Sequence, residues 1–461
     1  MIYISAQPDE VYFLWQLELQ LFNFCGFGIP IERIHILIGY HPEKGLNPII
    51  EQFIQENPNI CIFAYPDTRQ RKKYLSSLRP HILAKHFWQH PELETETIFY
   101  HDSDILFTKV PDWQPLLKDD CWYASDTHSY LDSSYIKEYA GEFEFKKMCE
   151  ILSIDPCLVE ENDLSAGGAQ YILKSCTAQF WEKVESDCEN LFAYLYYRQK
   201  YLTHIHRDFQ IWCTDMWVVW WNAILLGCRF KTHKLLDFCW ANSPVADLER
   251  KTILHYTGSC RTKNTIFDKT KYQTHAPFYT DQSAIATDIC SSLVVDTIGQ
   301  YRAVLDNKRP KLDDTAFMIL LDPEDLLSEK RASVTMRYLM RYFSVDVMTS
   351  VSNDKKSTWR SLKANYCWII PAGFIIPVHD MQTIAEELIS NPDADLSYEG
   401  KVAKVDPLGS HVFSTLLDIC YLEENAGKTI ATPHTVRVYV HNKKQSDNRL
   451  LSGKIVRIYE V

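Results

Sequence analysis

Several features that are common in other protein classes are scarce or missing in this 461-residue chain. Only 15 residues are glycine, so flexible glycine-rich linkers are not expected. The 14 cysteines include no CxxC pair, which argues against a zinc site or a disulfide framework and for reduced thiols in a cytoplasmic protein. No apolar run reaches the roughly 20 residues of a membrane-spanning helix. The start lacks a positively charged segment and soon reaches Pro8 and Asp9, so it does not predict a signal peptide.

An excess of basic charge is also lacking. The chain has 48 Lys and Arg against 60 Asp and Glu, a formal net charge of −12, which predicts no global attraction to nucleic acid or anionic membranes. Local basic clusters can still bind phosphates. The hydrophobic share of 46% and the charged share of 23% are typical of a globular protein. A chain of this length exceeds one ordinary core, which predicts two domains.

Strand and helix patterns alternate along the first hundred residues. Short apolar runs predict buried parallel strands, and helical patterns separate these runs. The expected strands are residues 3–5, 34–38, 60–65 and 97–100, and the expected helices are 9–24, 49–54 and 78–88. This order predicts an α/β fold with a mostly parallel sheet and helices on both faces. Ligands of such sheets bind at the carboxyl ends of the strands.

The remaining sequence divides into three stretches. Residues 1–280 are expected to form one domain, whose later part is rich in tryptophan and tyrosine. Residues 281–313 predict a helical connection. Residues 314–461 predict a second, smaller α/β domain, closed by a hairpin of residues 436–440 and 454–459.

An acidic motif follows the fourth expected strand. Asp102-Ser103-Asp104 lies between two apolar runs, and acids two positions apart at a strand end can face the same side. A solvated turn is the alternative, but burying two unpaired carboxylates is costly, so a cation is expected beside them. A second Asp-x-Asp at residues 393–395 follows no strand and is assigned no function. Carboxylates suit Mn²⁺ or Mg²⁺, which can bridge a diphosphate and stabilise it as a leaving group.

These residues resemble a known group of enzymes. The Asp102-Ser103-Asp104 segment resembles the DxD motif of glycosyltransferases with the GT-A fold, and Ser165-Ala166-Gly167-Gly168 resembles their small-residue segment along the donor sugar. With Asp215-Met216 and His255-x-x-Gly258, the order resembles the group that includes peptidyl serine galactosyltransferases and hydroxyproline arabinosyltransferases. The group usually has Glu-Met where this chain has Asp215-Met216, which leaves the acceptor open.

The resemblance, over about residues 1–280, implies a fold, a cofactor and substrates. The fold is a GT-A, Rossmann-like domain that binds a nucleotide-sugar. The cofactor is Mn²⁺ or Mg²⁺, held by Asp102, Asp104 and a late histidine, His255. The donor is a UDP-sugar, and the acceptor is a glycan, a peptide or a protein. For His255 the alternative is a packed histidine bonded to the backbone.

Further residues are expected to contact the donor. The loop after the first strand is expected to meet the nucleoside, the basic residues the diphosphate, and the small residues the sugar. They are Gln7, Asp9, Arg79, Lys85, Ser103, Ser165, Gly167, Gly168 and Gln170, with Lys263 and Lys269 as alternative phosphate ligands. Structural alternatives are a helix cap for Asp9, a strand-entry turn for the glycines and a solvated face for the basic residues.

Asp215 is the first candidate for the catalytic acid or base, with Asp163 as the alternative. A helix-capping role is the structural alternative for Asp215. Trp217, Trp220 and Trp221 follow it on one helical stripe, which predicts burial. Two other functions remain open. One is a non-catalytic sugar- or peptide-binding protein with a degenerate transferase fold. The other is a phosphotransferase with an Asp nucleophile, whose motif normally continues with Thr or Val where this chain has Leu106.

Overall fold

The computed structural model describes most of the first three hundred residues and separate segments thereafter. The described residues are 1–202, 204–258, 264–273, 276–308, 315–324, 326–342, 346–351, 366–372, 374–375, 395–404, 434–442 and 455–459. The chain forms two compact units. The first comprises Met1–Leu46, Ile50–Lys271 and Gln282–Thr297, and the second Asn47–Ile49, Tyr272–Asp281 and Ile298–Val461.

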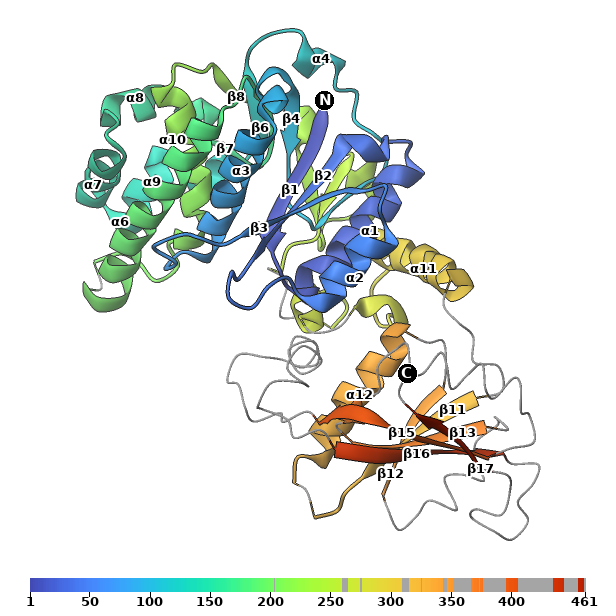
Figure 1. The fold of residues 1–461 in the computed structure, drawn as a ribbon. Helices are drawn as coiled ribbons and strands as arrows, with labels where there is room; N and C mark the ends of the chain where they lie inside the picture. Colours follow the sequence, from blue (N-terminus) through green and yellow to red (C-terminus); the bar gives the residue numbers. More distant parts are fainter. Residues whose placement is uncertain are drawn as a thin grey trace. The chain divides into compact units, whose positions relative to one another are not determined.

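A seven-stranded sheet forms the centre of the first unit (Figure 1). Its order is β3-β2-β1-β4-β7-β6-β8. The strands are β1 (Ile2–Pro8), β2 (Ile34–Tyr40), β3 (Cys61–Pro66), β4 (Thr97–Tyr100), β6 (Trp122–Asp126), β7 (Gly167–Lys174) and β8 (Phe230–Thr232). Only β7 runs against its two neighbours, because β1 to β4 are mutually parallel and β6 is parallel to β8. The predicted α/β class with a mostly parallel sheet is therefore confirmed.

Apolar side chains on both faces explain why the first strands are central. Ile4, Leu37 and Ile98 are fully buried, as expected for strands covered by helices on both sides. In Figure 1 the sheet lies between α1 (Val11–Gly26) and the group of α3, α9 and α10. These three helices are Leu78–Gln89, Ala178–Tyr197 and Thr214–Leu225.

The first helix begins differently from the expectation. Its N-cap is Glu10, without a side-chain capping bond, so Asp9 as the cap is wrong. The physical reason is that the Asp9 N–H donates to Gly39 O at 2.9 Å, which continues the sheet-like path beyond β1.

A small second sheet brings distant segments together. Strands β5 (Ile105–Phe107) and β10 (Ile253–His255) pair antiparallel, and β9 (Phe238–Trp240) runs parallel to β10. His255 lies opposite Ile105, and the Tyr256 N–H donates to Asp104 O at 3.1 Å. This pairing places the end of β10 directly beside the acidic motif that precedes β5.

The second unit contains another mixed sheet. Its order is β12-β11-β13-β16-β15-β14, with β17 also paired to β15. The strands are β11 (Thr315–Leu321), β12 (Asp346–Val351), β13 (Tyr366–Pro371), β14 (Phe374–Ile375), β15 (Asp395–Lys404), β16 (His434–Asn442) and β17 (Ile455–Tyr459). The predicted hairpin of the last two strands is wrong, because β15 lies between them, antiparallel to β16 and parallel to β17.

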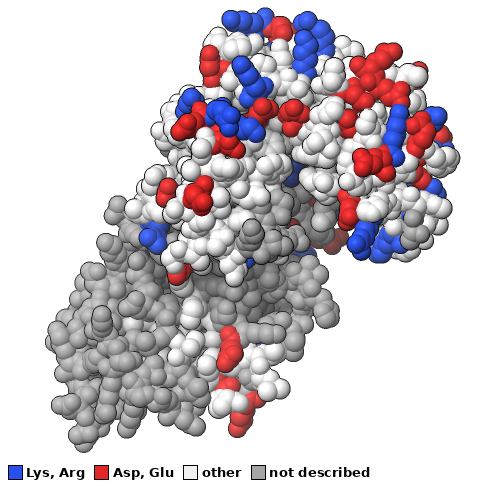
Figure 2. Space-filling view, turned by 180° about the vertical axis from the view of Figure 1, so that it is seen from behind, with Lys and Arg blue, Asp and Glu red and all other residues white. Residues whose placement is uncertain are grey.

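Helices complete the described part of the chain. They are α2 (Pro48–Glu56), α4 (Gln114–Leu117), α5 (His128–Leu131), α6 (Ser133–Ala140), α7 (Glu142–Leu152), α8 (Pro156–Glu161), α11 (Ser291–Lys308) and α12 (Ser328–Tyr342). Among the helices of the described residues, none combines the length and the apolar character that crossing a membrane requires. On the face drawn in Figure 2, acidic and basic side chains are interspersed.

Candidate active site

A pocket of about 680 Å³ opens at the carboxyl ends of β1 and β4. The end of β1 contributes Gln7, and the loop after β4 contributes the whole Asp102-Ser103-Asp104 motif. Asp215, at the start of α10, and His255, at the end of β10, complete the wall. All of its lining residues belong to the first unit. The pocket therefore lies where a mostly parallel sheet is expected to bind its ligand.

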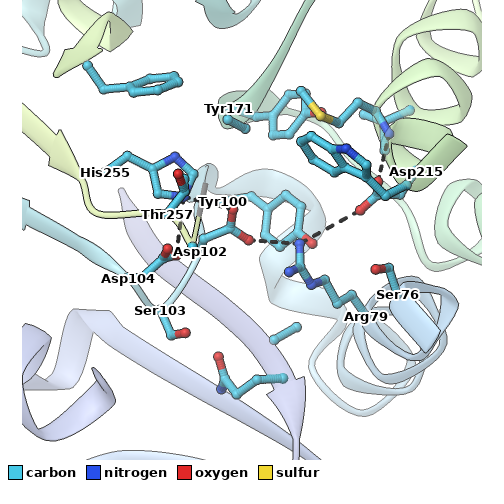
Figure 3. A pocket seen from close by; sticks show the side chains of 18 of the residues that line it. Ser76, Arg79, Tyr100, Asp102, Ser103, Asp104, Tyr171, Asp215, His255 and Thr257 are labelled. Carbon is cyan, nitrogen blue, oxygen red and sulfur yellow. Dashed lines mark hydrogen bonds and ion pairs between the residues drawn. The ribbon is translucent and has the colours of Figure 1, made fainter. Parts of the chain in front are cut away.

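Two carboxylates and one imidazole converge inside this pocket (Figure 3). Nε2 of His255 lies 3.2 Å from Oδ1 of Asp104 and 3.4 Å from Oδ2 of Asp102. One ligand atom from each of the three residues lies within 4.8 Å of the others, the spacing that a shared ion requires. Two carboxylate oxygens and one imidazole nitrogen are a donor set that suits Mn²⁺, and carboxylates also suit Mg²⁺. The residues present therefore fit a divalent metal.

Asp104 is the most strongly held member of this cluster. Its side chain is only 4% exposed, and Nζ of Lys269 lies 2.5 Å from its Oδ2. Burial acts to raise the pKa of Asp104, but the charges of Lys269 and His255 outweigh it and hold the pKa well below the usual range. The carboxylate is thus ionised at neutral pH and available to a cation. Lys269 itself lines the pocket.

His255 is oriented by a buried pair of polar side chains. Its Nδ1 lies 3.2 Å from Nε2 of Gln170, and Ser125 Oγ donates to Oε1 of Gln170 at 2.7 Å. Reversing the Gln170 amide satisfies the same contacts, since a hydroxyl both donates and accepts. In that arrangement the amide oxygen accepts from Nδ1–H of His255. Only then does Nε2 present a lone pair to a metal.

A second charged group lies beside the cluster of Asp102, Asp104 and His255. Arg79 is placed between two acids, with its guanidinium 2.7 Å from Oδ1 of Asp102 and 3.7 Å from Oδ2 of Asp215 (Figure 3). Tyr74 donates from its hydroxyl to Oδ1 of Asp215 at 2.8 Å. Burial raises the pKa of Asp215 above its ordinary value, although Arg79 and Tyr74 oppose the shift. Asp215 is thus a half-buried carboxylate of increased basicity in the pocket wall.

Two other expected donor contacts line the pocket with their side chains anchored. Gln7 donates from its amide to Leu37 O at 2.7 Å, and Ser103 Oγ donates to Oε1 of Gln16 at 3.1 Å.

Several expected site residues are bonded elsewhere and are not part of the pocket wall. Lys85 donates to Pro66 O at 2.6 Å, and Asp163 accepts from the Ser133 N–H at 2.9 Å. Asp9 and Ser165 are also absent from the wall. Lys263 lies outside the described residues.

The paired glycines are explained by packing. A Cβ on Gly168 would lie 2.2 Å from Cε of Met216, and one on Gly167 would lie 2.8 Å from Ser125 O. The pairing of β6 with β7 shifts register beside these glycines, and Ala169 has φ of 68°, a left-handed conformation that few side chains adopt. Ala169 lines the pocket, and Gln170 extends behind it to His255. The glycines therefore shape the wall without being part of it.

Sequence reasoning missed two features of the pocket. Tyr74 follows a basic run and carries no motif, so nothing in its sequence context indicates a contact with Asp215. Trp212, Tyr130 and Trp240 line the pocket, although aromatic residues are usually assigned to the core. Trp217, Trp220 and Trp221 are fully buried, as predicted.

Comparisons with known proteins give distant likenesses. Neither a protein-family model nor a curated protein matches the sequence. Similar solved structures include the bifunctional glycosyltransferase WbbM in its apo form, with 9% identity, a TM-score of 0.36 and coverage of 65% of this chain. The match spans about half, 49%, of the WbbM chain.

Two others are glycosyltransferases as well. The galactosyltransferase LgtC, in complex with donor and acceptor sugar analogues, has 10% identity, a TM-score of 0.33 and coverage of 65% of this chain and 96% of its own. Mouse xyloside xylosyltransferase 1 has 9% identity, a TM-score of 0.31 and coverage of 57% and 98%. Likenesses at these scores define neither the family nor the activity of this chain.

Proposed function

We propose that this chain is a metal-dependent glycosyltransferase, which moves a sugar from a nucleotide-diphosphate donor to an acceptor hydroxyl. The observation that carries the proposal is the convergence of Asp102, Asp104 and His255 at the carboxyl edge of a mostly parallel sheet. A divalent ion held there would act as a Lewis acid on the departing diphosphate. The order of motifs in the sequence, which resembles GT-A enzymes, supports the same assignment.

The residues around the proposed metal site have different roles in this reaction. Lys269 is placed to add positive charge beside Asp104, where the diphosphate would bind. Arg79 is bonded to Asp102 and Asp215, so it is better placed to orient these acids and the sugar than to bind phosphate. Asp215, a half-buried carboxylate with a raised pKa, can accept the proton of the acceptor hydroxyl or hold the hydroxyls of the donor sugar.

The finer assignments rest on the resemblance. We propose UDP as the nucleotide, Mn²⁺ or Mg²⁺ as the ion, and a hexose or pentose as the transferred sugar. The second unit is proposed to recognise the acceptor or a partner, and the protein is proposed to act in the cytoplasm.

The proposal is tested by screening nucleotide-sugars for hydrolysis with Mn²⁺ and with excess EDTA. We expect turnover with a UDP-sugar that EDTA abolishes and that Asp104→Ala loses while the protein stays folded. Full activity in EDTA would refute the metal site. Binding of a nucleotide-sugar without turnover would favour a non-catalytic sugar-binding protein, and hydrolysis of phosphate monoesters would favour a phosphotransferase.

The role of Asp215 has a matched control in the chain. Asp215→Asn keeps the shape but removes the charge, so transfer should fall at least about a hundredfold, the usual worth of a positioned base, while UDP binding persists. Asp163→Asn alters an acid that accepts a hydrogen bond from the Ser133 N–H outside the pocket, and it should leave transfer nearly unchanged. Near-normal transfer by a folded Asp215→Asn protein would show that the charge of Asp215 is not needed for catalysis and that its role is structural.

A further inference from the structure

One tryptophan of the pocket is unlike those that follow it in the chain. Trp212 is 57% exposed, whereas Trp217, Trp220 and Trp221 are fully buried. It belongs to a short 3-10 helix, Ile211–Cys213, immediately before α10, and it lines the pocket. Its indole N–H makes no hydrogen bond to any residue that the structure describes. A large apolar surface with an unused donor is thus presented to whatever enters the pocket.

The position of this indole is tied to the proposed catalytic acid. The hydroxyl of Tyr74 lies 2.6 Å from Trp212 O and 2.8 Å from Oδ1 of Asp215. Tyr74 is itself buried and stacks on Phe192 with ring centroids 4.5 Å apart. The single hydrogen of this hydroxyl is therefore shared between the Trp212 carbonyl and the Asp215 carboxylate, and the Asp215 N–H donates to the hydroxyl oxygen at 3.2 Å. Trp212 and Asp215 both line the pocket, so a molecule that packs on the indole lies in the same cavity as that carboxylate.

Polar groups surround the indole. The ring of Tyr130 lies 6.5 Å from that of Trp212, centroid to centroid, at an angle of 35°. Gln210 also lines the pocket. Within the described part of the chain, neither the side-chain N–H groups of Gln210 nor the hydroxyl of Tyr130 has a hydrogen-bond partner, whereas Oε1 of Gln210 accepts from Cys213 Sγ at 3.9 Å. The site thus combines an aromatic face with neutral donors and acceptors.

This combination matches the chemistry of a sugar ring. A pyranose presents an apolar face of C–H groups, which packs on an aromatic face, and a rim of hydroxyls, which require neutral donors and acceptors. A peptide that binds by adding a strand would need free backbone groups at a strand edge. Here the backbone N–H of Gln210 is used by Tyr135, and that of Cys213 by Gln210 O.

We infer that the acceptor is a carbohydrate, whose terminal ring packs on the indole of Trp212 with its reacting hydroxyl toward Asp215. The inference rests on the proposed function, and it differs from the peptide or protein acceptor toward which the sequence resemblance points. Trp212 selects the acceptor and does not contribute to the binding of the nucleotide.

The experiment measures acceptor binding and donor turnover separately. Binding of methyl glycosides of common hexoses and pentoses is followed by saturation-transfer NMR, and donor hydrolysis is followed in parallel with Mn²⁺ and a UDP-sugar. The variants are Trp212→Ala, Trp212→Phe and, as the matched control, Trp88→Ala. Trp88 is 56% exposed but lies outside the pocket, where its indole donates to Glu182 at 2.8 Å.

We expect wild type to bind at least one glycoside and to use it as acceptor. Trp212→Ala should weaken that binding about tenfold or more, as expected for loss of an aromatic contact, and leave donor hydrolysis within about threefold. Trp212→Phe should restore most of the binding, and Trp88→Ala should change neither readout.

Three results would overturn the inference: no glycoside binding by wild type, unchanged binding by Trp212→Ala, or transfer to serine, threonine or hydroxyproline peptides but to no glycoside. A different result, absence of donor hydrolysis in wild type with glycoside binding intact, would refute the proposed transferase and leave the sugar site standing.

Discussion

Removing the amide of Gln170 should weaken metal binding without removing a metal ligand. Gln170 is 0% exposed, and its amide is the hydrogen-bond partner of Nδ1 of His255 at 3.2 Å. Without a metal, the imidazole can carry its proton on Nε2 and donate to Asp104. With a metal on Nε2, the proton must sit on Nδ1. In Gln170→Leu that buried N–H has no acceptor, so the penalty falls mainly on the metal-bound state.

The magnitude follows from this geometry. A buried donor without a partner costs about 1–3 kcal/mol, and loss of an outer-shell partner typically lowers metal affinity about ten- to a hundredfold. Calorimetric titration of Gln170→Leu with Mn²⁺ should therefore show a dissociation constant raised by about this factor. Thermal unfolding checks that the protein is folded.

Two further variants separate this effect from general damage. Gln170→Glu keeps an acceptor for Nδ1–H and should bind Mn²⁺ at least as tightly as wild type. Gln199→Leu removes amide bonds to His206 O and Phe209 O away from the pocket and should leave Mn²⁺ affinity unchanged. Wild-type affinity in folded Gln170→Leu would show that His255 is not held for a metal in this way.

Three other variants test separate parts of the structure. Arg79→Met should lower turnover about a hundredfold by misplacing the acids that it orients, with calorimetric UDP affinity retained; loss of that affinity would make Arg79 a phosphate ligand instead. Gly168→Ala should lower the free energy of unfolding, measured in urea, by about 1–3 kcal/mol, because the added Cβ would clash with Met216. The double variant with Met216→Ala should regain part of that stability. Burial lowers the pKa of His35 to about 4 and of His86 to about 2, below the unfolded value near 6.5. The unfolded state therefore binds the extra protons, and stability should fall below pH 6.5 by about 1.4 kcal/mol per pH unit for each histidine; replacing both with Gln should flatten that slope in unfolding measured at pH 7.5, 6 and 5.

The sequence predicted the sheet and the two acids of the candidate metal site because local patterns encode both, whereas His255 was expected from the resemblance to GT-A enzymes. The apolar runs that became β2 and β4 have the composition of buried strands, and the acids after β4 stand out by their apolar flanks. Contacts between distant segments carry no such signal. The bond between Tyr74 and Asp215 joins residues 141 positions apart, and Gln170 reaches His255 across 85 positions, so neither follows from periodicity or motif. The predicted hairpin of the last two strands was wrong for the same reason, because it is the distant strand β15 that separates them.

The pairing of β10 with β5 also determines the stage of protein synthesis at which the site can form. His255 follows Asp104 by 151 positions in the chain. At a synthesis rate of about 5–20 residues per second, about 8–30 s separate the appearance of the two side chains. Throughout that interval a nascent chain can hold β1 to β4 and both carboxylates, but neither the imidazole nor Lys269. The proposed metal site is therefore completed only after β10 has paired with β5, late in the synthesis of the first unit.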